Sequence, residues 1–245
     1  DGRYVVFKSH STNLVNNDTN GVNDSFLRDI QTGTTTRISV DSNGDQVSGR
    51  TDYPVISSSG EYVIFKSLAS DVVPGDSNGV KDIFRYNVQT GDVIRVSVDS
   101  FGVEQNTHSG SNYRDASISG DGRYVVFEST ATNLVPNDTN GTDDICLLDT
   151  QEGSTTRGSV HASGEQADGS QYDPEISADG RYIVYESIST NLVDGDLNGQ
   201  PDIFRYDTQT GETIIISLDS NGFQGDDDST DPTISADGRY VVFKS

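Results

Sequence analysis

A nine-residue segment recurs along this chain, and its spacing constrains the fold more than any other feature. The segment reads DGRYVVFKS at both its first and its last copy. Its glycine occupies Gly2, Gly60, Gly122, Gly180 and Gly238. Successive glycines are 58, 62, 58 and 58 residues apart, and the four extra residues lie between Gly102 and Gly122. Regular self-similarity at this period indicates one supersecondary unit per repeat.

Each repeat reads as four short strands, without helical periodicity. The first strand is PVIS or its equivalents ASIS, PEIS and PTIS, and an Asp-Gly pair, a common hairpin turn, follows it. The second strand, RYVVFKS, is apolar on both faces, as expected for a strand buried between layers. A long polar loop leads to a third strand such as DIFRYNVQTG, whose QTG begins the next hairpin. The fourth strand places Val93, Arg95 and Ser97 on one face, which is typical of a half-exposed outer edge.

Four-stranded units at this spacing predict an all-β fold, a β-propeller of four-stranded antiparallel blades with one blade per repeat. Solenoid repeats are shorter, and sandwiches do not repeat internally. The segments ISADGRYVVF and ISADGRYIVY resemble the signature of TolB-type, WD-repeat-like propellers, and the resemblance spans all four repeats. Ser59 replaces the aspartate before Gly60, which weakens one turn only. The resemblance implies a propeller but no single activity, because propellers host many.

The repeats predict one propeller domain, or a segment of a larger ring, over residues 1–245. Its repeats are expected at about 1–50 together with 231–245, at 51–110, at 111–170 and at 171–230. The chain begins and ends on the same second strand, whereas a four-bladed ring needs only one of these copies. Either one end is surplus or the chain is part of a larger ring, and the missing initial methionine favours the second reading.

A second motif, D-x-N-G-x-x-D, occurs once per repeat in the long polar loop, as DTNGVND, DSNGVKD, DTNGTDD and DLNGQPD. A turn alone explains Asn-Gly and one capping aspartate, but it does not require the second aspartate. Two carboxylates and an amide around a glycine are the hard oxygen donors that calcium prefers. The sequence therefore predicts calcium loops, with a bare turn as the alternative.

Placing the glycine at position 6 of an EF-hand loop assigns ligands at positions 3, 5, 7 and 9, the seventh through its backbone carbonyl. The predicted ligands are Asp18, Asn20, Val22 and Asp24; Asp76, Asn78, Val80 and Asp82; Asp138, Asn140, Thr142 and Asp144; and Asp196, Asn198, Gln200 and Asp202. Position 1 is Asn16, Pro74, Pro136 or Asp194. There is neither a regular glutamate at position 12 nor a flanking helix, so the loops are not EF-hands. They resemble the calcium hairpin loops of FG-GAP propellers in integrin alpha chains, which implies about four calcium ions, one per repeat.

The formal charge of −23 limits the partners of this chain. A surface this negative repels nucleic acid and anionic membranes and favours cations. No apolar run approaches the length of a membrane helix, so no membrane insertion is expected. Two carboxylates per loop suggest weak calcium affinity, which fits an extracellular or cell-surface protein of a bacterium, with the periplasm as an alternative.

The sequence gives no catalytic or cofactor-binding residue. The histidines, His10, His108 and His161, vary between repeats and are expected at the surface. Cys146 stands where other repeats have phenylalanine, so it is predicted to be a core residue that forms no disulfide. The acidic run GDDDSTD at 225–231 is expected to be a solvated loop, although an acid–base pair among so many carboxylates stays open.

Aromatic residues precede the first strands and suggest a possible ligand surface. They are Phe101, Tyr113, Tyr172 and Phe223, with Arg114 nearby. They could stack on a sugar or grip a peptide, or they could fill gaps between blades, which is the commoner use.

The leading functional prediction is a secreted or cell-surface calcium-binding propeller that acts as a binding or structural scaffold for an unidentified protein or glycan ligand. This chain alone is predicted not to be an enzyme. One alternative is the accessory propeller of a hydrolase or peptidase whose catalytic domain lies outside this chain. Another is a carbohydrate-binding propeller that uses the aromatic residues.

Overall fold

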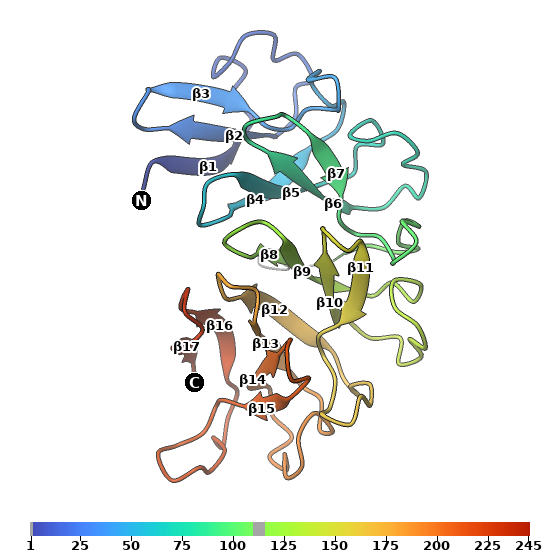
Figure 1. The fold of residues 1–245 in the computed structure, drawn as a ribbon, viewed down its shortest axis with the longest axis vertical. Coiled ribbons are helices and arrows are strands. Elements are labelled where there is room, and N and C mark those ends of the chain that lie inside the picture. Colours follow the sequence, from blue (N-terminus) through green and yellow to red (C-terminus); the bar gives the residue numbers. More distant parts are fainter. Residues whose placement is uncertain (1, 110–115) are drawn as a thin grey trace.

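The computed structural model describes residues 2–109 and 116–245, and these residues form strands without any helix (Figure 1). Tyr113 and Arg114 lie outside the described residues. The strands are β1 (Tyr4–Ser9), β2 (Asp24–Asp29), β3 (Thr34–Arg37), β4 (Thr51–Ile56), β5 (Tyr62–Ser67), β6 (Asp82–Asn87), β7 (Val93–Arg95), β8 (Ala116–Ile118), β9 (Tyr124–Ser129), β10 (Asp144–Asp149), β11 (Ser154–Arg157), β12 (Gln171–Ile176), β13 (Tyr182–Ser187), β14 (Asp202–Asp207), β15 (Thr213–Ile215), β16 (Thr230–Ile234) and β17 (Val241–Lys244). Within this part of the chain, no helix could therefore cross a membrane.

The strands form sequential antiparallel sheets, which confirms the predicted propeller blades. Three sheets have four strands, β4 to β7, β8 to β11 and β12 to β15, while β1–β2–β3 and β16–β17 form smaller sheets. The first strands β4, β8, β12 and β16 contact one another from blade to blade. The blades follow one another along an arc, with both chain ends on its open side (Figure 1). The sheet β16–β17 does not pair with β1, so the described blades do not close into a ring.

The core lies between neighbouring blades. In the four-stranded sheets, the second and third strands are the most buried, and every residue of β10 is buried. In the second blade, the rings of Phe65 and Phe84 stack with centroids 5.7 Å apart. Cys146 replaces the third-strand phenylalanine of the third blade and is 2% exposed, which confirms its predicted place in the core. Three hydrophobic clusters hold the sheets together, each combining residues of adjacent blades.

The Asp-Gly turns connect each blade to the next through backbone hydrogen bonds. The N–H of Ser59 donates to the carbonyl of Gly120 at 3.0 Å, and the N–H of Gly120 donates to Ala178 at 2.8 Å. Close packing accompanies this chain of bonds. Gly122 has φ +74°, and a Cβ there would lie 2.1 Å from the ring of Tyr62 on the preceding blade. Glycine is therefore required for both the turn conformation and the approach of the tyrosine.

Three first strands, β4, β12 and β16, extend further than the predicted PVIS, PEIS and PTIS segments because each contains a bulge. In β4, the register shifts between Asp52 and Val55, and Tyr53 between them has φ 51°. Asp173 and Asp231 adopt the same left-handed conformation in β12 and β16. A proline follows each of these residues and cannot donate to the ladder, so the bulge accommodates it while pairing resumes on both sides.

The fourth strands differ from the predicted half-exposed edge. They contain only three or four residues, and in the second repeat the Arg95 side chain is 8% exposed while Val96 and Ser97 are fully buried. Ile94 alone in this stretch has substantial exposure, at 38%. The expectation is wrong for Arg95 because the long loop covers this edge and receives its guanidinium group.

Substituting Gly122 tests the contact between blades. We expect Gly122→Ala to lower the free energy of unfolding by about 1–2 kcal/mol through the left-handed backbone and by about 1–3 kcal/mol more through overlap with Tyr62. Gly102→Ala is the matched control, because Gly102 has φ +77° with no atom within 4 Å of the added Cβ. Denaturant unfolding of both variants measures the difference. Equal losses would show that the tyrosine contact contributes nothing.

Candidate functional site

The four Asp-Asn-Gly-Asp loops reach the third strands at equivalent places. The last aspartate of each motif is the first residue of β2, β6, β10 or β14, and these four aspartates are at most 1% exposed. A buried carboxylate is costly unless hydrogen bonds or charges compensate it. The surroundings of these carboxylates therefore decide what the loops can do.

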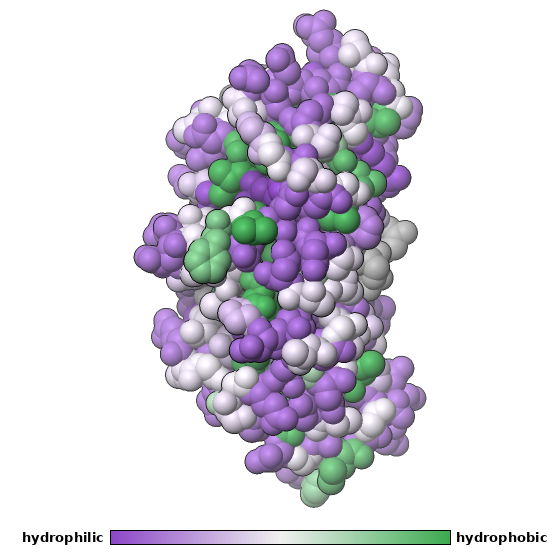
Figure 2. Space-filling model, turned by 90° about the vertical axis from the view of Figure 1, so that its right-hand side faces the viewer, coloured by the Kyte–Doolittle hydropathy of each residue, from purple (hydrophilic) through white to green (hydrophobic). Residues whose placement is uncertain are grey.

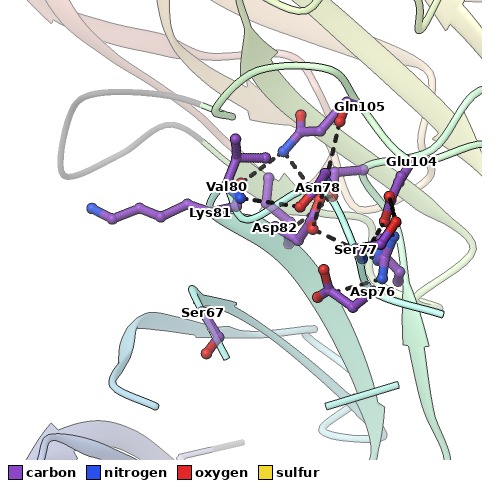
Figure 3. A network of polar contacts seen from close by, with 12 residues as sticks. Ser67, Asp76, Ser77, Asn78, Val80, Lys81, Asp82, Glu104 and Gln105 are labelled. Carbon is purple, nitrogen blue, oxygen red and sulfur yellow. Dashed lines mark hydrogen bonds and ion pairs between the residues drawn. The ribbon is translucent and has the colours of Figure 1, made fainter. Parts of the chain in front are cut away.

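The loop of the second repeat shows how the motif is held together (Figure 3). The amide nitrogen of Asn78 donates to Asp82 at 3.0 Å and to the carbonyl of Gln105 at 3.1 Å, while its oxygen accepts from the N–H of Val80 at 3.1 Å. The hydroxyl of Ser97 donates to Asp82 at 2.5 Å. This pattern joins the loop, the third strand, the fourth strand and the connection to the next blade.

The same contacts recur in the other repeats. The asparagine amide of each loop donates to the last aspartate and to a backbone carbonyl 27 residues further on. The last aspartate accepts from a serine hydroxyl just after the fourth strand. These serines are Ser39, Ser159 and Ser217. Each glycine of the motif has φ +67°, a conformation that disfavours other residues. Hydrogen bonding thus accounts for the asparagine and the last aspartate, and the backbone conformation accounts for the glycine.

The first aspartate of each loop faces a polar side chain from the connection to the next blade. Gln46 bridges both carboxylates of the first loop, donating to Asp18 at 2.9 Å and to Asp24 at 2.8 Å. Gln166 does the same in the third loop, and Gln224 donates to Asp196 in the fourth. In the second repeat the equivalent residue is Glu104, which accepts hydrogen bonds instead.

An arginine on the fourth strand supplies positive charge to three of the loops. Arg95 lies 3.4 Å from Asp76, 3.7 Å from Asp82 and 2.5 Å from Glu104. In the first loop the guanidinium of Arg37 is 4.0 Å from Asp18. In the third loop, Arg157 is 3.6 Å from Asp138 and 3.0 Å from Asp144. These guanidinium groups offset two carboxylates in surroundings where water screens little.

The arginines were missed in the sequence analysis, although the segments TTRIS, VIRVS and TTRGS carry them at one position of the repeat. They occupy the neighbourhood where calcium is expected. The residues expected to provide carbonyl ligands, Val22, Val80, Thr142 and Gln200, donate their N–H groups to the motif asparagines. Among the described residues, no group of three or more His, Cys, Asp or Glu side chains is placed to hold a metal. Calcium in the loops stays a prediction, and in three of them an arginine competes with it.

Burial raises the pKa of several loop carboxyls. It is the main cause for Asp82 and Asp144, and hydrogen bonds and the nearby arginine oppose it. The pKa of Asp76 is also raised by burial, against the charge of Arg95. The pKa of Asp196 is raised by burial and by the charges of Asp202 and Asp168, and the hydrogen bond from the neutral amide of Gln224 opposes this rise.

The side chains considered for nucleophilic chemistry have structural partners. His108 Nδ1 accepts the N–H of Lys81 at 2.9 Å, and His161 Nδ1 accepts the N–H of Ser163 at 3.1 Å within a turn. Burial raises the pKa of the Cys146 thiol, which keeps it protonated and unreactive. The absence of a catalytic residue remains a prediction.

A second candidate region lies where the first and second strands meet, and it consists of two neighbouring pockets that share Lys66. The charged pocket, of about 270 Å³, is lined by Arg50, Asp52, Lys66, Ser67, Leu68 and Lys81. The apolar pocket, of about 190 Å³, is lined by Tyr53, Val55, Ile64, Phe65, Lys66, Ile83, Ala116, Ser117, Pro174 and Glu175. Lys66 is 5% exposed, and burial lowers its pKa to about 8 against the charges of Glu128 and Asp52.

The position that Lys66 occupies in the second strand carries a different charge in different repeats. It is a lysine in the first two repeats, Lys8 and Lys66, and a glutamate in the next two, Glu128 and Glu186. The pKa of Glu186 is raised to about 7, first by burial and then by the charges of Asp173 and Asp231. The acidic run at 225–231 supplies part of the negative charge that raises the pKa of Glu186. Its residues 226–228 are exposed as expected.

Two of the described aromatic residues lie at the surface. Phe101 and Phe223 are 92% and 70% exposed in equivalent hairpin loops of the second and fourth repeats, so these two residues do not fill gaps between blades. Tyr172 lies instead in the first strand β12. The side of the molecule that carries the long loops is largely hydrophilic, with separate hydrophobic spots (Figure 2).

Comparison with known proteins places this architecture among propellers. No protein-family model and no curated protein matches the chain. Among solved structures, a protein assigned as TolB in Agrobacterium tumefaciens superimposes with a TM-score of 0.55 at 16% identity, over 100% of this chain and 72% of its own. TolB from Acinetobacter baumannii gives 0.51 at 16% identity, over 90% and 42%. The acylaminoacyl peptidase of Pyrococcus horikoshii gives 0.52 at 11% identity, over 99% and 34%.

These likenesses establish the fold: the chain has a β-propeller fold similar to that of the TolB structures. The chain spans less than half the length of the Acinetobacter TolB and about a third of the length of the peptidase. At such low identity the comparisons concern the fold alone, and function has to be argued from the site.

The raised pKa of Glu186 makes a prediction about stability and pH. Because the folded pKa, about 7, lies above the ordinary value of 4.5, the ionised carboxylate destabilises the fold above pH 7, and this penalty disappears as the pH falls below 4.5. Glu186→Gln should therefore raise the free energy of unfolding at pH 8 by about 1 kcal/mol, after allowance for solvent at this half-buried site. The gain should vanish near pH 4.5. Unfolding curves at both pH values measure it, and a gain independent of pH would contradict the assignment.

Proposed function

We propose that this chain is a non-catalytic binding module whose ligand occupies the charged and apolar pockets around Lys66. The observation that carries the proposal is the burial of an ionisable lysine where two pockets meet, in a protein with a formal charge of −23. Burying a cationic side chain is costly, and such groups concentrate at functional sites.

The lining of the two pockets defines the class of ligand. Arg50, Lys66 and Lys81 outnumber Asp52 in the charged pocket, so this pocket suits an anionic group. The adjoining pocket suits an apolar side chain, since Val55 and Ile64 contribute to its wall. A peptide that presents a carboxylate beside an apolar side chain satisfies both. A peptide is favoured over a glycan, because the ligand must present both a carboxylate and an apolar side chain.

A second candidate is an accessory propeller of a peptidase whose catalytic domain lies outside this chain. The superposition on the Pyrococcus acylaminoacyl peptidase, which covers 99% of this chain, supports it. Both candidates use the propeller for recognition rather than chemistry. The proposal includes a location outside the cytoplasm, and this location depends on the predicted calcium loops.

Peptide selection tests the binding proposal. A phage-displayed random peptide library panned against the purified chain should yield sequences with a carboxylate next to an apolar residue. Lys66→Met should weaken these peptides roughly 10- to 100-fold in a fluorescence-anisotropy titration, the effect of losing one charge-assisted hydrogen bond. The affinity should also fall as the pH rises above about 8, because Lys66 then loses its proton.

Lys244→Met is the matched control, because Lys244 holds the same position in the last repeat and is 78% exposed. It should leave the affinity unchanged. Enriched peptides whose affinity is insensitive to Lys66→Met, or no enrichment at all, would contradict the proposal. Unfolding curves of both variants separate lost binding from lost stability.

A further inference from the structure

The apolar pocket beside Lys66 has a carboxylate in its wall as well as an amine. Lys66 lies on β5 of the second blade, and Glu175 lies on β12 of the fourth blade. The first strand of the third blade, β8, contacts both β4 and β12 and contributes Ala116 and Ser117 to the same wall. The two opposite charges therefore reach this pocket of about 190 Å³ from different sides.

Hydrogen bonds hold the Glu175 carboxylate in place. The hydroxyl of Thr233 donates to Glu175 Oε2 at 2.6 Å, and the N–H of Ile234 donates to the same oxygen at 3.2 Å. Both donors are neutral, so these bonds orient the carboxylate without cancelling its charge. The corresponding residues of the other described first strands, Val55, Ser117 and Thr233, carry no charge. A carboxylate at this position is thus particular to β12.

The charges around the apolar pocket differ from one side to the other. On the side of the second blade, Lys66 shares the adjoining charged pocket with Arg50 and Lys81. On the side of the fourth blade, Asp173 directly precedes the pocket residue Pro174 and adds to the negative charge there. A ligand with a single charge would be repelled on one of these sides, whereas a ligand with both charges would be attracted on both.

Tyr53, which also lines the pocket, has an unfavourable backbone conformation for its residue type. Its φ of 51° lies in the left-handed region, which aspartate tolerates better than a bulky residue, and the equivalent Asp173 and Asp231 adopt it. The centre of its ring lies 4.4 Å from Nζ of Lys8 and 5.6 Å from Nζ of Lys66. Strained residues of this kind concentrate at ligand sites, and Tyr53 gives the pocket an aromatic wall next to the ammonium of Lys66.

We propose that the ligand of this pocket is a dipolar peptide segment, in which an apolar residue separates a carboxylate from an ammonium or guanidinium group. The carboxylate binds at Lys66, the apolar side chain packs against Tyr53 and Val55, and the cationic group binds at Glu175. This specificity rests on the proposed peptide-binding function and adds a second charge to it, which fixes the direction in which the peptide crosses the blades.

Peptides that are selected on the purified chain, and whose binding Lys66→Met weakens, test this specificity. They should carry a lysine or arginine on the other side of the apolar residue from the carboxylate. Glu175→Gln should weaken such a peptide about tenfold in a fluorescence-anisotropy titration, because it removes the charge while its amide oxygen still accepts the bonds from Thr233 and Ile234. Replacing the cationic residue of the peptide by norleucine should weaken binding to the unaltered chain by the same factor, and Glu175→Gln should then have no further effect.

Glu165→Gln is the matched control, because Glu165 is exposed in a hairpin loop and the substitution changes the net charge by the same amount. It should leave the affinity unchanged, which separates a local contact from the general attraction of cations to a chain with a formal charge of −23.

Lys66-dependent peptides that need no cationic residue would overturn the dipolar ligand and leave the binding function standing. An equal effect of Glu175→Gln on the original and norleucine peptides would do the same. An absence of Lys66-dependent peptides would overturn both proposals. If Glu175→Gln does not fold, an unchanged affinity of the norleucine peptide for the unaltered chain would overturn the dipolar ligand instead.

Discussion

The contact between successive Asp-Gly turns is the constraint on which the rest of the structure depends. The second, third and fourth turns along the chain each donate a backbone hydrogen bond to the turn that follows, and a tyrosine ring packs on the next glycine, as Tyr62 does on Gly122. This contact fixes the angle and spacing of the blades, so that their apolar second and third strands meet face to face. Since every blade repeats the turn, one local geometry propagates along the whole arc.

The long loops have a different role, because each covers a sheet edge with a polar segment. Each loop carries buried carboxylates into the structure, and a serine, an asparagine and usually an arginine compensate them. The arginine contributes charge, whereas the neutral donors contribute orientation. In the fourth repeat, Ile215 stands at the position of the arginine. The carboxylates there are held by neutral donors, Gln224 on Asp196 and Asn198 and Ser217 on Asp202.

The sequence predicts much of this fold because its signals are local and repeated. The apolar second strands, the Asp-Gly turns and the four-strand order follow from periodicity and turn chemistry. The bulge at Tyr53 was missed because its left-handed residue has no single identity across the repeats. The role of Arg95 was missed for another reason: its partners Asp76 and Glu104 lie in other segments, and only the tertiary structure brings them together. The clustering of charge around Lys66 likewise depends on the packing of neighbouring blades.

The central claim is that the contact between successive turns fixes the angle and spacing of the blades. A crystal structure of the Gly122→Ala variant tests it most directly. The account predicts that the Tyr62 ring is displaced from residue 122 and that β8 shifts relative to β4. An unchanged position of Tyr62 and of both blades around the added methyl group would contradict it.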